Sequence, residues 1–421
     1  MRACVVGLGK VGLPLAVQYA SRGLSVIGCD TDAAKVEQIN AGECPVVGEE
    51  GLEEGLKAAL REGRLHATID TAAAVAESVV AVIIVPVGLT ADRRPDFSHL
   101  DAATEALASG LRPGTLVLVE STVPVGTTRG RVGAALAAGG RRLGVDVLLA
   151  ASPERVSTGR IFRDLRTYPK LIGPLDEASW ARADAFYRAA LEAPCLLRVR
   201  DPETAEFAKL AEGLYRDVNI ALVDELARYA DALGIDVTEA IAAANSQPYS
   251  HLHQPGVGVG GHCLPVYPYF LPEEASLRLP AAARSINDAM ARYGVEKLEG
   301  ALGSLRGATV LILGLAYRPN VKEAAHSSAL PLAEALQERG ARVLVHDPWF
   351  SDEEVRALGL EPSSKFPPSH VDALIVQALH DAYRDLDLRS FAGCRAVLDG
   401  RNALDRSTVE AAGLRYLGIG R

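Results

Sequence analysis

The chain has 421 residues, of which 48% are hydrophobic and 23% are charged, a composition typical of a folded globular protein and not of a disordered one. This length predicts two or three domains, each with a core of its own. The formal net charge of −9 argues against a nucleic-acid-binding surface, whereas an anionic small molecule needs only a local basic pocket.

The cysteines and the N-terminal segment bear on the cellular compartment. The six cysteines form no C-x-x-C pair and no spacing typical of a disulfide framework, which predicts reduced thiols. The chain enters a predicted strand at once, without a signal peptide, and no apolar run reaches the length of a membrane span. We therefore expect a soluble cytoplasmic protein with neither a membrane nor a nucleic acid as partner.

The first thirty residues predict a βαβ unit. "RACVVGLG" is a short apolar strand that ends in glycine, "LPLAVQYASRG" predicts a helix ending at Gly23, and "LSVIGCD" predicts a strand ending at Asp30. Apolar strands follow in "SVVAVIIVPV", "GTLVLVES" and "VDVLLAASPER", with a helix-length segment between each pair. This alternation predicts a parallel sheet with helices on both faces.

The middle of the chain is mostly helical. Residues 201–236 predict one long helix, with Asp201 and Pro202 as cap and first turn and Gly234 as terminator. Strands alternating with helices return after about residue 306, in "GATVLILGLAY", "ARVLVHDPW", "VDALIVQA" and "CRAVLDGRN". The fold class is therefore α/β: two Rossmann-like, doubly wound parallel-sheet domains joined by a helical central domain with a long helix. The expected domains are residues 1–193, 194–306 and 307–421.

The segment from Gly7 to Gly12 reads "GLGKVG" and fits the G-x-G-x-x-G pattern between a strand and a helix. Gly7 permits the tight turn, Gly9 lets a pyrophosphate approach the backbone, and Gly12 allows close helix–strand packing. The helix N-terminus supplies a positive end for the phosphates. Asp30 ends the next strand, where its carboxylate is placed to bind the ribose hydroxyls of NAD and to repel the 2′-phosphate of NADP. An NAD site is thus preferred over a simple glycine-rich packing turn.

One cysteine lies in an unusual loop, "PGVGVGGHCLPVYPYFL", at residues 255–271. Glycines let the backbone come close to a substrate, and the proline, aromatic and leucine residues after Cys263 form a stiff apolar floor. This pattern favours a nucleophilic thiol over a cysteine that only fills a core. A metal site built from His251, His253, His262 and Cys263 is the weaker alternative, because no second Cys/His pair completes a structural zinc spacing.

Five motifs, in this order and at this spacing, resemble the UDP-glucose/GDP-mannose dehydrogenase family, closest to its UDP-N-acetylhexosamine 6-dehydrogenase branch. They are "ESTVPVGTT" (120–128), "SPERVSTG" (152–159), "AEFAKLAEGLYRDVN" (205–219), the cysteine loop, and "LGLAYRPNVKEAAHSSAL" (313–330). The family's cysteine loop typically reads G-G-H-C-I-P-V-D-P-Y-Y-L. The resemblance covers essentially the whole chain, and it implies NAD-dependent oxidation of the C6 alcohol of a nucleotide sugar to a carboxylate.

The resemblance also implies what each domain does. Residues 1–193 are expected to bind NAD, residues 194–306 to carry the cysteine loop and the dimer contact, and residues 307–421 to bind the nucleotide sugar. The long central helix resembles a dimer core, so a homodimer is expected. The active site is expected in the cleft between the two sheet domains, at the carboxyl ends of their strands.

A covalent mechanism is implied. The Cys263 thiolate adds to the aldehyde formed by the first hydride transfer, and the resulting thiohemiacetal loses a second hydride to become a thioester, which water hydrolyses. Lys209 is the implied ammonium that lowers the pKa of the thiol and steadies the oxyanion. Glu154 is the implied base that activates the water, and Thr122 matches a threonine beside the nicotinamide. Each residue also has a simpler interpretation. Lys209 could be an exposed lysine on a helix, and Glu154 could be a solvated carboxylate or a partner of Arg155. Thr122 could be a turn residue with a hydroxyl group.

Binding residues complete the predicted site. The cofactor set is Gly7, Gly9, Lys10, Val11, Gly12, Asp30, Lys35, Pro86, Val87 and Thr122. The substrate set is Arg155, Val156, Lys209, Arg216, His253, Gly260 and Arg318. Arginine suits a diphosphate because its donors form a fork, although an arginine that only carries surface charge is the alternative at each position. No metal is expected.

Three positions depart from the family pattern. Gly213 stands where the family has Asn, and Tyr267 stands where it has Asp. The family's D-D-x-R-E-S-P becomes "KEAAHSS", so that Lys322, Glu323 and Ala325 replace two Asp and one Arg. Three possibilities remain open: full oxidation of an unusual nucleotide sugar or related conjugate, oxidation that stops at another level, or non-catalytic binding of NAD and a nucleotide sugar. The three implied catalytic residues favour chemistry.

Other oxidoreductases also combine a Rossmann domain with long helices. Dehydrogenases of the 6-phosphogluconate and 3-hydroxyacyl-CoA types have this plan and need no cysteine. The second sheet domain after residue 306 and the cysteine loop argue against them. Stoichiometry distinguishes the classes, because oxidation of an alcohol to an acid yields two NADH per sugar, oxidation to a carbonyl yields one, and binding alone yields none.

Overall fold

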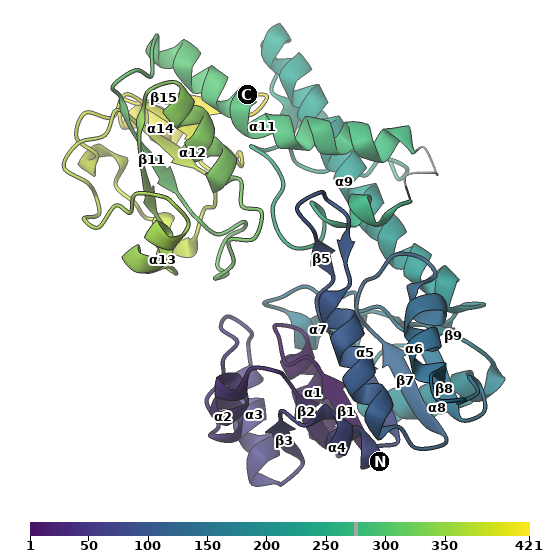
Figure 1. Cartoon of the computed structure of the whole chain (residues 1–421). Helices are drawn as coiled ribbons and strands as arrows, with labels where there is room; N and C mark the ends of the chain where they lie inside the picture. Colours follow the sequence, from purple (N-terminus) through teal and green to yellow (C-terminus); the bar gives the residue numbers. More distant parts are fainter. Residues whose placement is uncertain (273–276) are drawn as a thin grey trace. The chain divides into compact units, whose positions relative to one another are not determined.

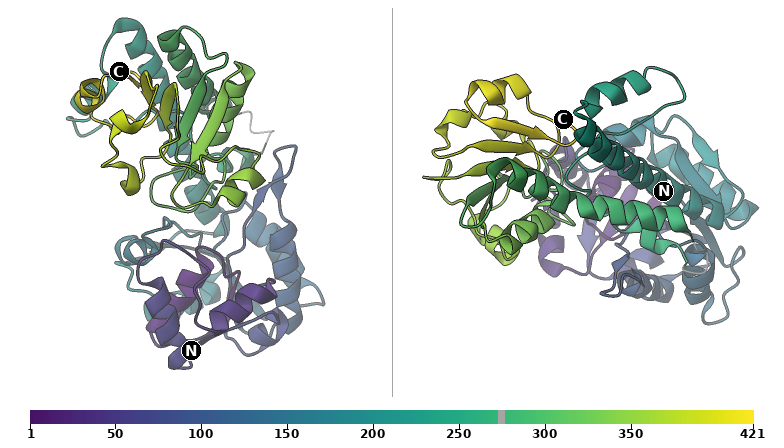
Figure 2. Two further views of the ribbon diagram at one scale, coloured as in Figure 1. Left: turned by 90° about the vertical axis from the view of Figure 1, so that its left-hand side faces the viewer. Right: turned by 90° about the horizontal axis from the view of Figure 1, so that it is seen from above.

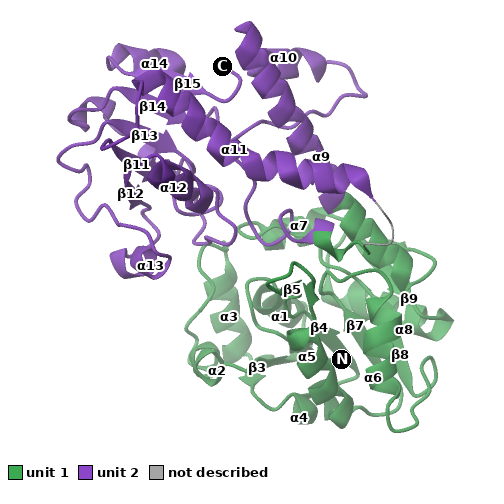
Figure 3. Ribbon diagram, turned by 45° about the horizontal axis from the view of Figure 1, so that its top comes forward, with its two compact units in different colours: residues 1–212, 269–272 green, residues 213–268, 273–421 purple. Residues whose placement is uncertain are grey.

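The structure is a computed structural model that describes residues 1–272 and 277–421. The chain forms two compact units, coloured separately in Figure 3: unit 1 is residues 1–212 and 269–272, and unit 2 is residues 213–268 and 273–421. The boundary at residue 212 falls inside one long helix, α9 (Pro202–Leu233). Each unit has its own sheet and core, and the domain boundaries at residues 193 and 306 stay a prediction.

Unit 1 is built on a sheet of eight strands in the order β10-β9-β8-β7-β4-β1-β2-β3. Neighbouring strands pair in parallel except for β8 and β9, which run antiparallel. The strands are β1 (Arg2–Val6), β2 (Ser25–Cys29), β3 (Leu65–Thr68), β4 (Val80–Ile83), β7 (Thr115–Val119), β8 (Val147–Ala151), β9 (Lys170–Pro174) and β10 (Leu196–Arg198), with a separate hairpin of β5 (Gly88–Leu89) and β6 (Pro95–Asp96). The sequence analysis did not identify β3, β9 or β10.

Helices cover both faces of this sheet (Figure 1). In β7, Leu116 and Leu118 enter one core while Val117 and Val119 enter the other, so the strand reads as a continuous apolar run. The first core contains α1 (Gly12–Ser21), α2 (Ala33–Asn40), α3 (Leu52–Arg61), α7 (Ile161–Thr167) and α8 (Glu177–Ala190). The second contains α4 (Thr71–Ala76), α5 (Ser98–Gly110), the π-helical η1 (Thr127–Val132) and α6 (Gly133–Ala137).

Unit 2 contains a second sheet, of five parallel strands in the order β12-β11-β13-β14-β15. The strands are β11 (Thr309–Leu313), β12 (Arg342–His346), β13 (Ala373–Val376), β14 (Ala396–Asp399) and β15 (Arg415–Gly418). The helices are α10 (Val237–Ala244), α11 (Arg278–Leu302), α12 (Ala329–Glu338), α13 (Asp352–Ala357) and α14 (Arg406–Ala411), with short turns η4 (Asp381–Tyr383) and η5 (Leu388–Ser390). A further turn, η2 (Tyr267–Phe270), lies near the end of the cysteine loop, and the boundary between the units falls within it.

The long predicted helix is confirmed at both ends. Asp201 Oδ1 accepts a hydrogen bond from the backbone N–H of Thr204 at 2.9 Å, and Gly234 has φ +69° directly after the last helical residue. In unit 2, α9 lies against α11, as the views in Figure 2 show, and the Tyr293 hydroxyl and the Lys297 ammonium both donate to Asp231.

The predicted α/β fold with two sheets and a helical middle is therefore confirmed, and the pairing within these two sheets is parallel throughout except between β8 and β9. Among residues 1–272 and 277–421, no helix is both long enough and apolar enough to span a membrane.

Candidate active site

The predicted site residues of unit 1 gather along one edge of its sheet. The strands β8, β7, β4, β1 and β2 are consecutive neighbours and pair in parallel, so their carboxyl ends share one edge. The loops at that edge carry Glu154 after β8, Thr122 after β7, Pro86 and Val87 after β4, the Gly7–Gly12 segment after β1, and Asp30 after β2. The strand order reverses between β4 and β1, which is where open α/β sheets bind their ligands.

The three glycines of the loop after β1 are required for different structural reasons. Gly7 has φ +101°, and a Cβ placed there would lie 2.6 Å from the carbonyl oxygen of Ile84. A Cβ on Gly12 would lie 1.8 Å from the Gly7 oxygen, so α1 packs against the loop too closely for a side chain. A Cβ on Gly9 meets nothing within 4 Å, which leaves this part of the backbone open to a pyrophosphate at the start of α1. The half-buried Val11 and the exposed Lys10 complete the turn.

Asp30 ties this loop to the end of β2. Its Oδ2 accepts hydrogen bonds from the Leu8 backbone N–H and the Lys35 ammonium, both at 3.0 Å, and its Oδ1 accepts one from the Asp32 N–H at 3.1 Å. Burial opposes ionisation of Asp30, but these hydrogen bonds outweigh it and hold the pKa of Asp30 below its usual range. An ionised carboxylate beside a glycine-rich helix start fits the ribose and pyrophosphate of NAD.

The loops after β4 and β7 are joined by a hydrogen bond. The Ser121 hydroxyl donates to the carbonyl oxygen of Val85 at 2.7 Å, which brings the loop of Pro86 and Val87 next to the loop of Thr122. Val87 packs against the second core of the sheet, whereas Pro86 is exposed and Thr122 is half-buried. The three residues predicted to lie near the cofactor thus belong to two loops that are held together.

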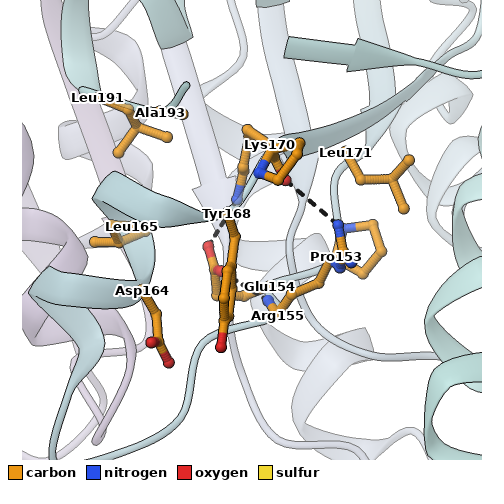
Figure 4. A pocket seen from close by; sticks show the side chains of 11 residues that line it. Pro153, Glu154, Arg155, Asp164, Leu165, Tyr168, Lys170, Leu171, Leu191 and Ala193 are labelled. Atoms are coloured by element: carbon orange, nitrogen blue, oxygen red, sulfur yellow. Dashed lines mark hydrogen bonds and ion pairs between the residues drawn. The ribbon is translucent and has the colours of Figure 1, made fainter. Parts of the chain in front are cut away.

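Glu154 is held by both of its carboxylate oxygens (Figure 4). Its Oε1 accepts hydrogen bonds from the backbone N–H groups of Arg155 at 2.7 Å and Val156 at 3.3 Å, and its Oε2 accepts one from the Lys170 ammonium at 2.7 Å. The side chain is only 9% exposed, so Glu154 is not a solvated strand-end carboxylate. The Arg155 guanidinium pairs with Glu212 of α9 instead of with Glu154.

Lys170 is a buried cation that the sequence analysis missed. At the start of β9, its ammonium also donates to Glu120 Oε2 at 2.9 Å, and its side chain is 5% exposed. The hydroxyls of Tyr187 and Tyr19 donate to the other oxygen of Glu120, at 2.6 Å and 3.2 Å. The available signal was a single lysine in the apolar stretch "YPKLIGP", because lysine is rarely fully buried without a partner.

The environments of the two carboxyl groups push their pKa values apart. Burial raises the pKa of Glu120, and the nearby Glu154 adds to this, against the opposing effect of Lys170. Burial also acts on Glu154, but Lys170, the Arg155 N–H and the charge of Lys209 outweigh it and lower the pKa of Glu154. The structure thereby brings the predicted Lys209 within electrostatic reach of Glu154. Two neighbouring carboxyl groups whose pKa values are shifted in opposite directions are typical of acid–base sites.

A small pocket opens beside this network, and Figure 4 shows the side chains around it. Glu154 and Lys170 are among the residues that line it. The other lining residues are Pro153, Arg155, Asp164, Leu165, Tyr168, Pro169, Leu171, Leu191 and Ala193.

In unit 2, the cysteine loop is fixed at several backbone positions, while Cys263 itself is exposed. The Gly256 N–H donates to Asp224 Oδ1 at 2.9 Å, the Arg401 guanidinium donates to the Gly258 oxygen at 2.8 Å, and the Gly261 N–H donates to the Ala325 oxygen at 2.8 Å. The thiol is therefore presented to solvent on an anchored backbone. No group of three or more His, Cys, Asp or Glu side chains able to hold a metal ion occurs in residues 1–272 and 277–421.

The predicted substrate residues of unit 2 lie in two places near this loop. Burial lowers the pKa of His253, and the charge of Arg216 lowers it further, so these two residues are neighbours. A Cβ on Gly260 would lie 2.7 Å from the Tyr317 Cβ, and Arg318 Nε donates to the Tyr317 hydroxyl at 2.9 Å. Gly260 and Arg318 therefore both contact Tyr317. Unit 2 thus contains two of the arginines predicted to bind the diphosphate, Arg216 and Arg318.

Most departures from the family pattern contact one another or the cysteine loop, whereas Lys322 pairs with Glu354 of α13. A Cβ on Gly213 would lie 3.1 Å from Cδ2 of Tyr267, so the glycine in α9 leaves room for the aromatic ring. Glu323 Oε2 lies 3.0 Å from Nε2 of His262, the residue that precedes Cys263 in the chain. The backbone oxygen of Ala325 accepts a hydrogen bond from the Gly261 N–H. Gly213 and Tyr267 are thus coupled to each other, and Glu323 changes the surroundings of the residue that precedes Cys263.

Three domain families match the chain in order. The NAD binding domain of the UDP-glucose/GDP-mannose dehydrogenase family matches residues 1–191, its central domain matches residues 203–289, and its UDP binding domain matches residues 311–406. The chain belongs to this family. It is an oxidoreductase of the NAD-dependent nucleotide-sugar dehydrogenase class, and its cofactor is NAD.

The chain is similar in sequence and in structure to dehydrogenases from archaea and bacteria. A UDP-N-acetyl-D-mannosamine dehydrogenase from Pyrococcus horikoshii is 35% identical and covers 100% of this chain and 99% of its own, and a solved structure from that organism has a TM-score of 0.89. An NDP-N-acetyl-D-galactosaminuronic acid dehydrogenase from Ralstonia nicotianae is 33% identical over 97% of each chain. A UDP-glucose dehydrogenase structure from Pyrobaculum islandicum has 32% identity and a TM-score of 0.88, covering 100% of this chain and 97% of its own.

Replacement of Asp30 by alanine tests the cofactor site. Loss of hydrogen bonds to a charged group costs about 1.5–3 kcal/mol, so NAD should bind about tenfold to a hundredfold more weakly, with the nucleotide sugar little affected. Isothermal titration with each ligand measures both affinities. Asp32→Ala is the matched control, because it removes the cap of α2 and leaves the Asp30 carboxylate in place. A loss of sugar affinity alone in Asp30→Ala would contradict the assignment.

The contact between Gly213 and Tyr267 predicts that their substitutions are not additive. Alanine stabilises a helix interior by up to about 1 kcal/mol relative to glycine, so Gly213→Ala should stabilise the protein once Tyr267→Ala has removed the ring. With Tyr267 present, the added methyl must displace the ring, and this gain should shrink or reverse. Urea unfolding of the two single variants and the double variant measures the coupling, and additive effects would mean that the two positions are independent.

Proposed function

We propose that this enzyme oxidises the C6 alcohol of a UDP-N-acetylhexosamine-like sugar to the carboxylate in two hydride transfers, with Cys263 as covalent nucleophile. The observation that carries the proposal is an exposed Cys263 thiol on an anchored backbone, in a chain that also has an anchored acid at Glu154. The names of the Pyrococcus and Ralstonia relatives support an N-acetylated hexose in the substrate.

NAD⁺, when bound, accepts the hydride that leaves C6 in each oxidation. The Gly7–Gly12 segment would hold its pyrophosphate against the start of α1, and Asp30 would hold its ribose. Thr122, Pro86 and Val87 belong to the two joined loops at the same edge and are assigned to the nicotinamide side. These residues orient the cofactor, and the covalent chemistry belongs to the cysteine.

Cys263 adds as a thiolate to the C6 aldehyde, forming a C–S bond and placing negative charge on the former carbonyl oxygen. We assign Lys209 to stabilise the thiolate and this oxyanion with its ammonium group. The thiohemiacetal oxyanion then loses the hydride of C6 and becomes the thioester, as its negative charge forms the new carbonyl bond. Glu154 removes a proton from water as the water oxygen bonds to C6, and the C–S bond breaks to release the acid and the thiolate.

The nucleotide sugar carries a diphosphate, and the chain provides arginines for it. Arg155 and Val156 follow the same strand as Glu154, while Arg216, His253, Gly260 and Arg318 belong to unit 2. Forked guanidinium donors match phosphate oxygens in pairs. Tyr267 replaces a carboxylate next to the nucleophile with an aromatic ring, and we propose that this changes which sugar is accepted.

A panel of nucleotide sugars with NAD⁺ tests this proposal. UDP-N-acetylmannosamine, UDP-N-acetylgalactosamine, UDP-N-acetylglucosamine and UDP-glucose are each incubated with the enzyme, and NADH yield and product mass are measured. We expect two NADH per sugar and a carboxylate product for one N-acetylhexosamine. Cys263→Ser should abolish acid formation without weakening NAD binding, because only the nucleophile is lost.

Other outcomes of the panel contradict parts of the proposal. One NADH per sugar would show that oxidation stops at the aldehyde, and binding without NADH would show a non-catalytic protein. Normal acid formation by Cys263→Ser would exclude the thioester route.

We also propose that the enzyme is a homodimer that works in the cytoplasm, where its six free cysteines remain reduced. An apolar stripe along α9 supports a dimer contact, because large side chains recur there at spacings of three, four and seven residues, as in helix-pairing seams. Its members and exposed fractions are Tyr215 (55%), Leu222 (47%), Leu226 (36%), Tyr229 (64%) and Leu233 (53%). A second copy of this chain would cover the stripe through an isologous contact.

A charge placed in this stripe should prevent dimer formation. Leu222→Lys combined with Tyr229→Lys leaves ammonium groups without water in the contact, so the variant should sediment as a monomer in analytical ultracentrifugation. Glu334→Lys, an exposed position in α12 and not in α9, is the control and should sediment like the unchanged protein. A monomeric unchanged protein would contradict the proposal.

A further inference from the structure

We infer that Lys170 is a positioning residue for Glu154 in the hydrolytic step, an inference that rests on the role proposed for Glu154. Its ammonium lies 2.7 Å from Glu154 Oε2, inside the pocket wall that both side chains form. The backbone N–H groups of Arg155 and Val156 hold the other oxygen. Three donors from two neighbouring strand ends therefore fix the plane of the carboxylate.

Lys170 is itself held from its far side. Glu120 Oε2 accepts from the same ammonium at 2.9 Å, and Glu120 Oε1 accepts from the hydroxyls of Tyr187 in α8 and Tyr19 in α1. The side chains of Lys170 and Glu120 are 5% and 0% exposed, so neither is free to turn toward solvent. A continuous network of buried hydrogen bonds thus runs from the two tyrosines through Glu120 and Lys170 to Glu154.

The orientation that Lys170 enforces suits the reaction assigned to Glu154. A carboxylate oxygen has two lone-pair directions, and the ammonium occupies one of those on Oε2, which leaves the other for a water molecule. A general base acts only when it is within hydrogen-bond reach of the proton that it removes. Without Lys170, Glu154 can rotate, and its carboxylate also loses the cation that keeps it ionised in a buried site.

The experiment determines which step of the reaction becomes slow in each variant, from the NADH produced and the amount of acylated Cys263. Glu154→Gln should make both NADH of the first turnover normally but hydrolyse the thioester about 10²–10⁴-fold more slowly, so that an acylated Cys263 accumulates and is seen by intact-protein mass spectrometry. Lys170→Met should show the same pattern, with a normal NADH burst, steady-state turnover at least about tenfold lower and accumulated acyl-enzyme. Lys170→Arg keeps the charge and the donors and should recover part of the turnover.

Two further variants separate positioning from general damage. Lys297→Met removes a partly buried ammonium that pairs with Asp231 in unit 2, far along the chain from Glu154, and it should not accumulate acyl-enzyme. If Lys170→Met does not fold, as judged by circular dichroism, Tyr187→Phe provides the test. It removes one hydrogen bond from Glu120 without burying a charge, and it should give a smaller accumulation of the same adduct.

The outcomes distinguish this inference from the proposed function. Accumulation in Glu154→Gln but in neither Lys170→Met nor Tyr187→Phe would overturn the positioning role and leave the thioester route intact. Equal accumulation in Lys297→Met would also overturn it, since any loss of stability would then produce the adduct. Absence of an adduct in Glu154→Gln, together with normal acid formation, would overturn the role proposed for Glu154 itself.

Discussion

Parallel pairing of β8, β7, β4, β1 and β2 is the constraint on which unit 1 depends. Because parallel strands end at the same edge, loops separated by more than a hundred residues of chain deliver their side chains to one place. The glycine loop and Asp30 take the cofactor part of that edge, and Glu154 takes the end near β9. The sheet therefore fixes the order of the functional groups before any side chain interacts with another.

Electrostatics then determines what those groups are able to do. A lysine buried between two carboxylates is stable only because both partners and two tyrosine hydroxyls satisfy the charges. The result is asymmetric: Glu154 has a lowered pKa and lines a pocket, while Glu120 has a raised pKa and is fully buried. One carboxylate is thus prepared for chemistry and the other supports it.

Unit 2 presents its chemistry differently, on a loop whose backbone is held by side chains from several elements. Asp224, Arg401 and the Ala325 carbonyl fix glycines on the approach to Cys263. The departures from the family pattern fall at this loop: Gly213 accommodates Tyr267, and Glu323 pairs with His262. Because both pairs touch the cysteine loop, the departures alter the surroundings of one segment of the chain.

The sequence by itself determined the alternation of the central strands and helices of both sheets, the glycine loop with Asp30, the limits of the long helix and the motif around Cys263, because each depends on residues close together in the chain. It did not identify β9 or Lys170, since that lysine interrupts an apolar run and its partners lie 50 and 16 positions away. Only the tertiary structure decided that Glu154 is anchored instead of solvated and that Gly213 makes room for Tyr267. Such contacts depend on how strands pair and helices pack, and no local pattern encodes them.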